Sequence, residues 1–513
     1  MSKDEATSAR SSWRDDFTGP GVWIVTALVA VLHLAVAARY DFFRNELYFI
    51  ICGRHPAFGY VDQPPLVPLL AAATQVFGNY LFLLRLPAVL AATALVPVTA
   101  ALARTLGGDA RAALVAAIAA AIAPGLGAIT SNLGTATFEP LGWTLCAYFL
   151  LRATEHDDLG ALLWAGLVAG LSLEAKYGIA VWLVGLSAGA IVAGRARILG
   201  TRNFWLAVFI TVAIGGPSLV WQAAEGWPFL AIIAHHNEEG AYFNGSPLRF
   251  FFTQTLAMNI LLAPLWLGGL IAPFAMKNLK PARILATAFV VSAVAIFLAH
   301  GKDYYLFPAF PPLFAAGGVA AERLNRWLRG VWLVLAVANS ALIAPLMLPI
   351  LPPPAHERMI KRIGAPKPNE AAGIGAKITQ VFSDEFAWRD LEAKTASVYR
   401  GLTAADRANT AIFASNYGEA AAIDFFGRAD GLPTASSGQN QYFLWGPQKA
   451  NPSVLIVING DPPRWQSLCR SLTQAATFGA PYAMPYEDNR PIFLCRGLRS
   501  PLARIWPELK RFQ

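Results

Sequence analysis

The sequence predicts a mainly α-helical, polytopic membrane protein, in which a bundle of about eleven spans precedes a small water-soluble α/β domain. Three observations lead to this prediction. Of the 513 residues, 55% are hydrophobic and only 14% are charged, whereas soluble domains carry about 25% charged residues. The apolar residues form long runs without Asp, Glu, Lys or Arg. After Leu351-Pro-Pro-Pro354 these runs shorten and charges return. This composition excludes a disordered chain, a coiled coil and an ordinary cytosolic enzyme.

Each apolar run predicts one helix of the bundle. Most runs reach the roughly 18–20 residues that a helix needs to cross about 30 Å of hydrocarbon. The runs 140–151 and 159–173 are shorter, and we interpret Glu139 as lying near one end of a span that begins around Thr135. In chain order the runs are 21–38, 86–103, 112–138, 140–151, 159–173, 177–194, 203–224, 250–276, 284–301, 304–321 and 330–355.

Basic residues between the runs predict the orientation. Alternate connections carry twelve Lys and Arg on one side and six on the other, and the richer side is expected to be cytoplasmic. Residues 1–20 are then a cytoplasmic tail, residues 21–350 the membrane part, and 39–79 its first outer loop. Residues 351–513 lie outside. The net charge of +9 is scattered in ones to threes, which excludes a phosphate-tracking patch for nucleic acid.

The outer part, 351–513, has the pattern of an α/β domain. Residues 410–415 and 454–459 predict buried strands, and 418–426 predict a helix. Cys469 and Cys495 lie in this part and could form a disulfide in an oxidising compartment.

Polar residues gather in the first outer loop. A group of charged residues stands within 22 positions there, and the spacing from Asp41 and Asn45 to Tyr48 suits one face of a short interfacial helix. Pro64 and Pro65 predict a rigid approach to the next apolar segment. The group includes Asp41, Arg44, Glu46 and Asp62.

Further polar residues stand at span ends on the same predicted face. Ionisable groups at membrane depth are costly and usually face an internal cavity with partners. Their convergence on one side therefore predicts a functional site. These residues are Glu139, Lys176, Lys302, Asp303, Tyr304 and Tyr305.

Two segments of the first loop carry a resemblance to a known family. Arg44-Asn-Glu-Leu-Tyr48 and Gly59-Tyr-Val-Asp-Gln-Pro-Pro-Leu66 resemble the first external loop of bacterial membrane glycosyltransferases. These enzymes form the dolichyl-phosphate-mannose-protein mannosyltransferase superfamily, which has the GT-C architecture and includes relatives that transfer aminoarabinose to lipid A. The resemblance covers about residues 20–350. Three later segments also resemble the family: Phe138-Glu-Pro-Leu-Gly-Trp143, Leu173-Glu-Ala-Lys-Tyr177 and Gly301-Lys-Asp-Tyr-Tyr-Leu-Phe-Pro308.

The resemblance implies transfer of one sugar, with inversion, from a polyprenyl-phosphate carrier to an acceptor on the outer face of the bacterial inner membrane. The acceptor could be a lipid, a glycan or a protein. The implied catalytic residues are Glu46, Asp62 and Glu139, with Asn45 and Asp41 beside them. The implied donor-phosphate residues are Lys176, Lys302, Tyr304, Tyr305 and Arg44. The implied loop and acceptor residues are Tyr48, Gln63, Pro64 and Pro65.

Two positions depart from the family. Asn45 stands where the family usually has an aspartate, and an amide cannot take a proton as a carboxylate does. Either Glu46, Asp41 or Asp62 is the base, or Asn45 only positions the acceptor, or the chain is inactive. Gln63 replaces the lysine that precedes the two prolines in the aminoarabinose transferases, and this substitution removes one implied phosphate contact.

The chemistry of such a transfer agrees with these residue types. A carboxylate must take the proton of the acceptor hydroxyl, and cations must stabilise the leaving phosphate. A divalent metal ion could assist, but no spacing indicates one. Two other interpretations stay open: a lipid or glycan transporter, which would carry charges near the bilayer midplane, and a non-catalytic binding protein derived from the same fold.

Overall fold

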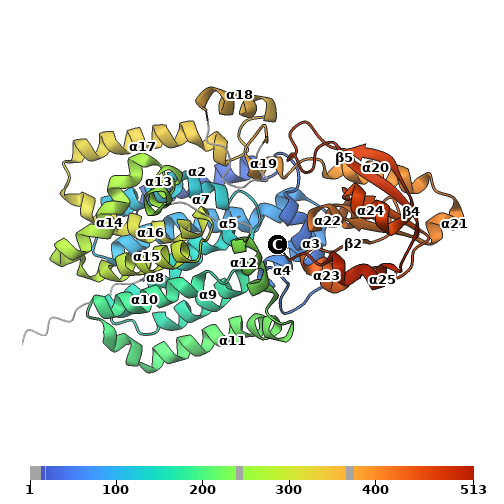
Figure 1. Cartoon of the computed structure of the whole chain (residues 1–513). Coiled ribbons are helices and arrows are strands. Elements are labelled where there is room, and N and C mark those ends of the chain that lie inside the picture. Colours follow the sequence, from blue (N-terminus) through green and yellow to red (C-terminus); the bar gives the residue numbers. More distant parts are fainter. Residues whose placement is uncertain (1–12, 18, 239–245, 365–374, 513) are drawn as a thin grey trace, which may run out of the picture.

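A computed structural model describes residues 13–17, 19–238, 246–364 and 375–512. Most of the predicted tail, 1–20, lies outside these residues. The chain is mainly helical and ends in a small region with a sheet. Figure 1 shows the long helices at one side of the molecule and the sheet at the other. Helix α3 lies between the two parts.

Seventeen α-helices are described before residue 350, and most follow the predicted runs. Two runs are divided. The run 112–138 breaks at Pro124, and the run 250–276 forms two helices that meet at 101°. The helices are α1 (Trp13–Asp16), α2 (Pro20–Val36), α3 (Arg44–Arg54), α4 (Leu66–Thr74), α5 (Leu81–Thr105), α6 (Ala110–Ile122), α7 (Pro124–Ile129), α8 (Glu139–Glu155), α9 (Ala161–Ala175), α10 (Ile179–Val192), α11 (Arg202–Ala224), α12 (Pro228–Glu238), α13 (Pro247–Ala257), α14 (Ala263–Ala275), α15 (Arg283–Leu298), α16 (Phe310–Ala320) and α17 (Arg326–Met347).

The bend between α13 and α14 corrects the prediction of one helix over 250–276. Asn259 adopts a φ of 73° there, which a continuous helix does not allow. Its side chain then accepts a hydrogen bond from the backbone N–H of Leu261 and starts the next turn. Short polar side chains tolerate this left-handed conformation better than others do.

Four helical segments among the described residues are long and apolar enough to cross a membrane. They are α5, α11, the segment Lys277–Leu298 and α17, and the bent pair α13–α14 would add a fifth. Shorter apolar helices such as α9 and α10 accompany them. The count of about eleven spans stays a prediction.

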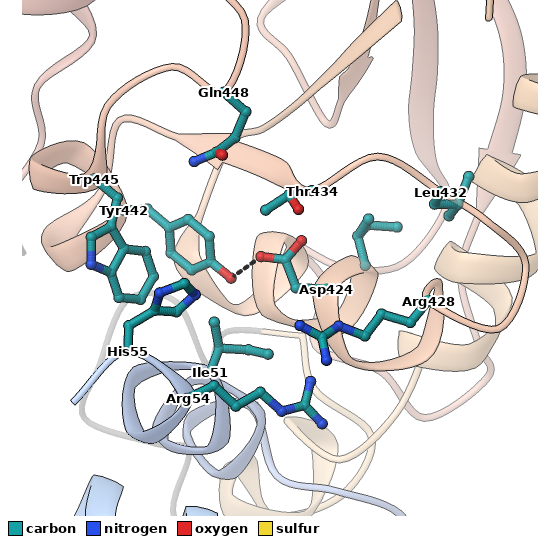
Figure 2. Close-up of a pocket in the computed structure, with 11 residues that line it drawn as sticks. Ile51, Arg54, His55, Asp424, Arg428, Leu432, Thr434, Tyr442, Trp445 and Gln448 are labelled. Atoms are coloured by element: carbon teal, nitrogen blue, oxygen red, sulfur yellow. Dashed lines mark hydrogen bonds between the residues drawn. The ribbon is translucent and has the colours of Figure 1, made fainter. Parts of the chain in front are cut away.

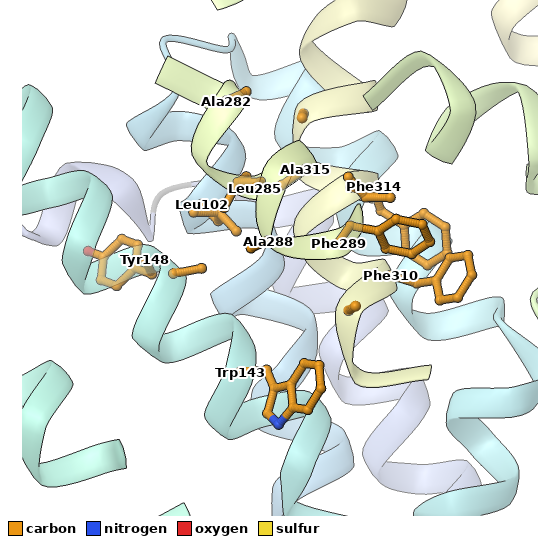
Figure 3. Close-up of a cluster of buried hydrophobic side chains, with 14 of the residues drawn as sticks. Leu102, Trp143, Tyr148, Ala282, Leu285, Ala288, Phe289, Phe310, Phe314 and Ala315 are labelled. Carbon is orange, nitrogen blue, oxygen red and sulfur yellow. The ribbon is translucent and has the colours of Figure 1, made fainter. Parts of the chain in front are cut away.

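The helices pack closely through small residues and aromatic rings. A Cβ on Gly269 of α14 would lie 2.1 Å from the carbonyl oxygen of Leu313, and a Cβ on Gly317 of α16 would lie 2.1 Å from that of Leu265. Small residues allow this backbone approach, which is typical of membrane helices. Figure 3 shows the aromatic part of this core, where Phe289 and Phe310 pack edge to face with ring centres 5.2 Å apart.

A five-stranded sheet follows, with the order β2-β1-β3-β5-β4. Strands β2, β1 and β3 are parallel, and β5 and β4 are antiparallel to their neighbours. Cys469 and Cys495 form a disulfide bond, one of the two outcomes that the sequence allowed. The strands are β1 (Thr410–Ala414), β2 (Ala435–Ser437), β3 (Val454–Ile458), β4 (Cys469–Phe478) and β5 (Arg490–Leu498). The helices are α18 (Pro353–Ile363), α19 (Gln380–Ser383), α20 (Trp388–Arg400), α21 (Ala404–Ala408), α22 (Tyr417–Phe426), α23 (Asn440–Trp445), α24 (Pro462–Leu468) and α25 (Leu502–Ile505).

The predicted strands at 410–415 and 454–459 and the helix at 418–426 are confirmed as β1, β3 and α22. The sheet region and the first loop share one hydrophobic core. Residues of α3, including Tyr48 and Ile51, are buried together with Ala421 and Tyr442 of the C-terminal region. Helix α22 packs directly on α3. This shared core fixes the first loop against the C-terminal region.

Candidate active site

The turn that carries Asp62 is held from two sides. The backbone N–H of Tyr60 donates to the carbonyl of Gln63 at 2.9 Å and closes the turn. On one side the Gln222 amide of α11 donates to the carbonyl of Tyr60 at 2.8 Å. On the other side Gln441 of α23 accepts from the N–H of Val61 at 3.1 Å. Asp62 is therefore positioned jointly by a membrane helix and the C-terminal region.

The carboxylate of Asp62 is half-buried and keeps acceptor capacity. Its Oδ1 accepts from the Tyr48 hydroxyl at 2.9 Å, and its Oδ2 accepts from the Asn440 amide at 3.4 Å. Burial raises the pKa of Asp62 to about 6, and these two hydrogen bonds oppose that rise. A carboxylate with this pKa is ionised near neutral pH and is a stronger base than an exposed aspartate.

Asn45 and Arg44 meet Tyr417 beside this carboxylate. The Tyr417 hydroxyl donates to Oδ1 of Asn45 at 2.8 Å, and its ring lies 4.7 Å from that of Tyr48. The Arg44 guanidinium lies 5.3 Å from the centre of the Tyr417 ring. Burial raises the pKa of Tyr417, and the charges of Asp62 and Lys302 both act on its hydroxyl. Tyr417 thus contacts the first loop directly and lies within the electrostatic reach of Lys302.

Glu46 is in a very different environment. It is fully buried, and its Oε1 accepts from Arg85 Nε and from the N–H of Leu133, both at 2.9 Å. Its Oε2 accepts from Arg85 Nη2 and from the N–H of Phe43, again at 2.9 Å. Arg85 also pairs with Glu385 of the C-terminal region at 3.2 Å. Four donors therefore occupy the acceptor sites of Glu46.

A second polar group lies at the ends of α8 and α9. Lys176, just after α9, donates to Oε2 of Glu139 at 2.8 Å. Its Nζ lies 4.0 Å from the centre of the Tyr305 ring and 5.2 Å from that of Tyr304. Both tyrosines lie in a 3₁₀ helix, Asp303–Ala309, that directly follows Lys302. The late loop therefore supplies both aromatic rings that lie beside the Lys176 ammonium group.

The remaining predicted residues have structural contacts. Asp41 forms an ion pair with Arg389 of α20 at 2.6 Å. Gln63, Pro64 and Pro65 are buried where the turn leads into α4. Among the described residues, no group of three or more His, Cys, Asp or Glu side chains could hold a metal ion. The divalent ion considered from the sequence stays a prediction.

Several contacting residues were missed by the sequence reasoning. Arg85 is a lone cation beside an apolar run, and the cost of such a charge at membrane depth was a signal that could have found it. Tyr417, Asn440 and Gln441 gave no such signal, because their partners in the first loop are more than 370 residues away along the chain.

Comparison with known proteins gives two findings. Residues 62–221 match the family model of dolichyl-phosphate-mannose-protein mannosyltransferases. Among solved structures, the chain is similar to ArnT from Cupriavidus metallidurans bound to undecaprenyl phosphate, with 14% identity and a TM-score of 0.60 over 93% of this chain and 98% of that one. The apo form of the same protein gives 14% identity and a TM-score of 0.60 over 92% and 97%. No curated protein sequence matches the chain. At this identity the structural likeness shows the fold.

Proposed function

We propose that this chain, which has the fold of the GT-C glycosyltransferase superfamily, transfers a sugar from a polyprenyl-phosphate carrier to an acceptor on the outer face of the inner membrane, with inversion at the anomeric carbon. The observation that carries the proposal is the half-buried carboxylate of Asp62, which accepts from the Tyr48 hydroxyl beside the ring of Tyr417. The charge of Lys302 also acts on the Tyr417 hydroxyl. This arrangement pairs a proton acceptor with cations that suit a leaving phosphate.

Asp62 is the proposed base. Its oxygens accept only two hydrogen bonds from described side chains, one of them long at 3.4 Å. An acceptor hydroxyl could therefore approach it and lose its proton as it attacks the anomeric carbon. Asn45 then positions the acceptor through its amide, and the family aspartate is not required at that place.

Lys176, Lys302 and Tyr305 are the proposed partners of the donor phosphate. Lys176 currently pairs with Glu139, and a phosphate would compete with that carboxylate for the ammonium group. Cations held in a water-poor site stabilise a developing phosphate charge better than solvated ones do. The fold likeness to ArnT bound to undecaprenyl phosphate supports a lipid-linked donor.

A transfer assay tests the proposal. Purified full-length protein is mixed with a panel of polyprenyl-phosphate sugars and an extract of its own membrane lipids. We expect donor to be consumed only when acceptor is present, and Asp62→Asn to abolish this consumption. If the folded wild-type protein turns over no donor while Asn45→Asp gains activity, the natural chain is a degenerate transferase. If both stay silent, the binding-protein interpretation replaces this proposal.

A further inference from the structure

A cavity of about 330 Å³ lies between the end of α3 and the C-terminal region. Helix α23 connects it to the candidate active site, because Asn440 at the start of that helix contacts Asp62 and Tyr442 lines the cavity. The Tyr442 ring also stacks on Tyr48 with centres 6.3 Å apart. The cavity is thus separate from the proposed base but shares a wall with it, and it has the size of a small ligand pocket.

Positive charge gathers in this cavity. Figure 2 shows the guanidinium groups of Arg54 and Arg428 near each other below Asp424, with His55 at the opposite side. Nη1 of Arg54 is buried and has no hydrogen-bond partner among the described residues. Burial and the neighbouring charge of Arg428 lower the pKa of Arg54, which means that the two like charges repel.

The carboxylate among the lining residues offsets only part of this charge, because one aspartate faces two guanidinium groups. Asp424 already accepts from the Tyr442 hydroxyl at 2.7 Å and from the N–H of Ala435 at 2.8 Å. Burial raises the pKa of Asp424 to about 6. Two adjacent guanidinium groups with one unfilled buried donor are the arrangement that binds a phosphate or carboxylate, since such oxyanions accept charge-assisted hydrogen bonds from both.

The rest of the lining suits a sugar ring. Thr434 and Gln448 bring a hydroxyl and an amide to the cavity, and these groups can exchange hydrogen bonds with sugar hydroxyls. Trp445 and Ile51 supply flat and apolar surface. A free inorganic anion would contact only the arginines, whereas a sugar ring would also contact these hydroxyl, amide and apolar groups.

We propose that this cavity binds an anionic sugar, a ring that carries a phosphate or a carboxylate, and that this sugar belongs to the acceptor. Of these two statements, only the assignment of the bound sugar to the acceptor rests on the proposed transferase function. The acceptor is favoured over the donor because the cavity lies against the C-terminal region, whereas Lys176 follows the apolar helix α9 and the late loop joins α15 to α16. A sugar held here would present the neighbouring part of its glycan toward Asp62.

Ligand-observed NMR titrations on the full-length protein in lipid nanodiscs, without donor, test the binding. The probes are glucose 1-phosphate, glucuronate, glucose and inorganic phosphate. We expect the two charged sugars to bind about tenfold more tightly than glucose or phosphate. Arg428→Gln is expected to weaken the charged sugars about tenfold and to leave glucose unchanged, because Arg428 is exposed and its loss should not disturb folding. The matched control, Arg499→Gln, removes an exposed arginine elsewhere in the same region and is expected to change nothing.

Three results would overturn the proposal: glucose binding as tightly as the charged sugars, inorganic phosphate binding as tightly as glucose 1-phosphate, or charged-sugar binding that is absent or insensitive to Arg428→Gln. Because no donor is present, these results are independent of the transfer assay. Binding that depends on Arg428 in a protein without transferase activity would keep the site and remove only its link to an acceptor.

Discussion

Glu46 and Asp62 stand in the same first loop, and both are carboxylates that the sequence offers as bases. At the start of α3, Glu46 is fully buried, accepts four hydrogen bonds and pairs with Arg85. On the turn before α4, Asp62 is half-buried and accepts two hydrogen bonds from uncharged side chains. Residue type alone therefore does not determine which of them can take a proton.

This difference in burial and hydrogen bonding indicates a structural role for one carboxylate and a chemical role for the other. A proton on Glu46 would break its pairing with the buried guanidinium of Arg85 and leave only Glu385 to compensate that charge, which is costly. A proton on Asp62 only competes with Tyr48 and Asn440 and relieves the cost of burying a charge. Glu46 is then the group that joins the first loop, α5 and the C-terminal region, and Asp62 is the group available for chemistry.

The largest effect is expected for Asp62→Asn. Loss of a general base reduces the rate of transfer by about 10²–10⁴-fold, and the amide keeps the size of the side chain, so folding is preserved. Initial rates of sugar transfer and thermal unfolding should be measured on the same preparation. Asp41→Asn, which removes a half-exposed carboxylate paired with Arg389, serves as the control in the same loop. If both variants lose activity equally, Asp62 is not the general base.

Glu46→Gln is expected to act on stability instead. It leaves the Arg85 charge incompletely paired and lowers the free energy of unfolding by about 3–5 kcal/mol, which thermal unfolding in detergent would detect. Glu225→Gln, at an exposed glutamate, is the control and should leave the unfolding temperature unchanged. A Glu46→Gln protein with wild-type stability and no transfer would reverse the assignment and make Glu46 the base.

The sequence predicted the positions of the helices better than it predicted these tasks. Apolar runs report where helices form, because burial in lipid requires them, and a short helix around Asn45 and Tyr48 and strands β1 and β3 followed from local patterns, although α3 begins only after Asp41. The bend at Asn259 was missed because one polar residue in an apolar run does not reveal its backbone conformation. The surroundings of Glu46 and Asp62 depend on Arg85, Tyr417 and Asn440, which only the folded chain brings near them.

The pH dependence of transfer distinguishes the two carboxylates further. Asp62 must be ionised to act as a base, and burial raises its pKa to about 6. Activity should therefore be retained above pH 6 and fall about tenfold per pH unit below it. Values of kcat/KM between pH 4.5 and 8 would show this limb. A limb near pH 4 would indicate a solvated carboxylate as the base, and residual activity of Asp62→Asn should have no limb near pH 6.

The smallest effect is expected for Tyr48→Phe, which removes only the hydroxyl that donates to Oδ1 of Asp62 at 2.9 Å. That hydrogen bond favours the ionised carboxylate and lowers its pKa. Its loss should therefore move the acidic limb of the pH profile upward by up to about one unit, with little change in rate at pH 8. Tyr399→Phe, whose hydroxyl contacts only the carbonyl of Arg407 among the described residues, should leave the limb in place. A Tyr48→Phe limb that stays in place would mean that the titrating group is not Asp62, because no other carboxylate among the described residues accepts from this hydroxyl.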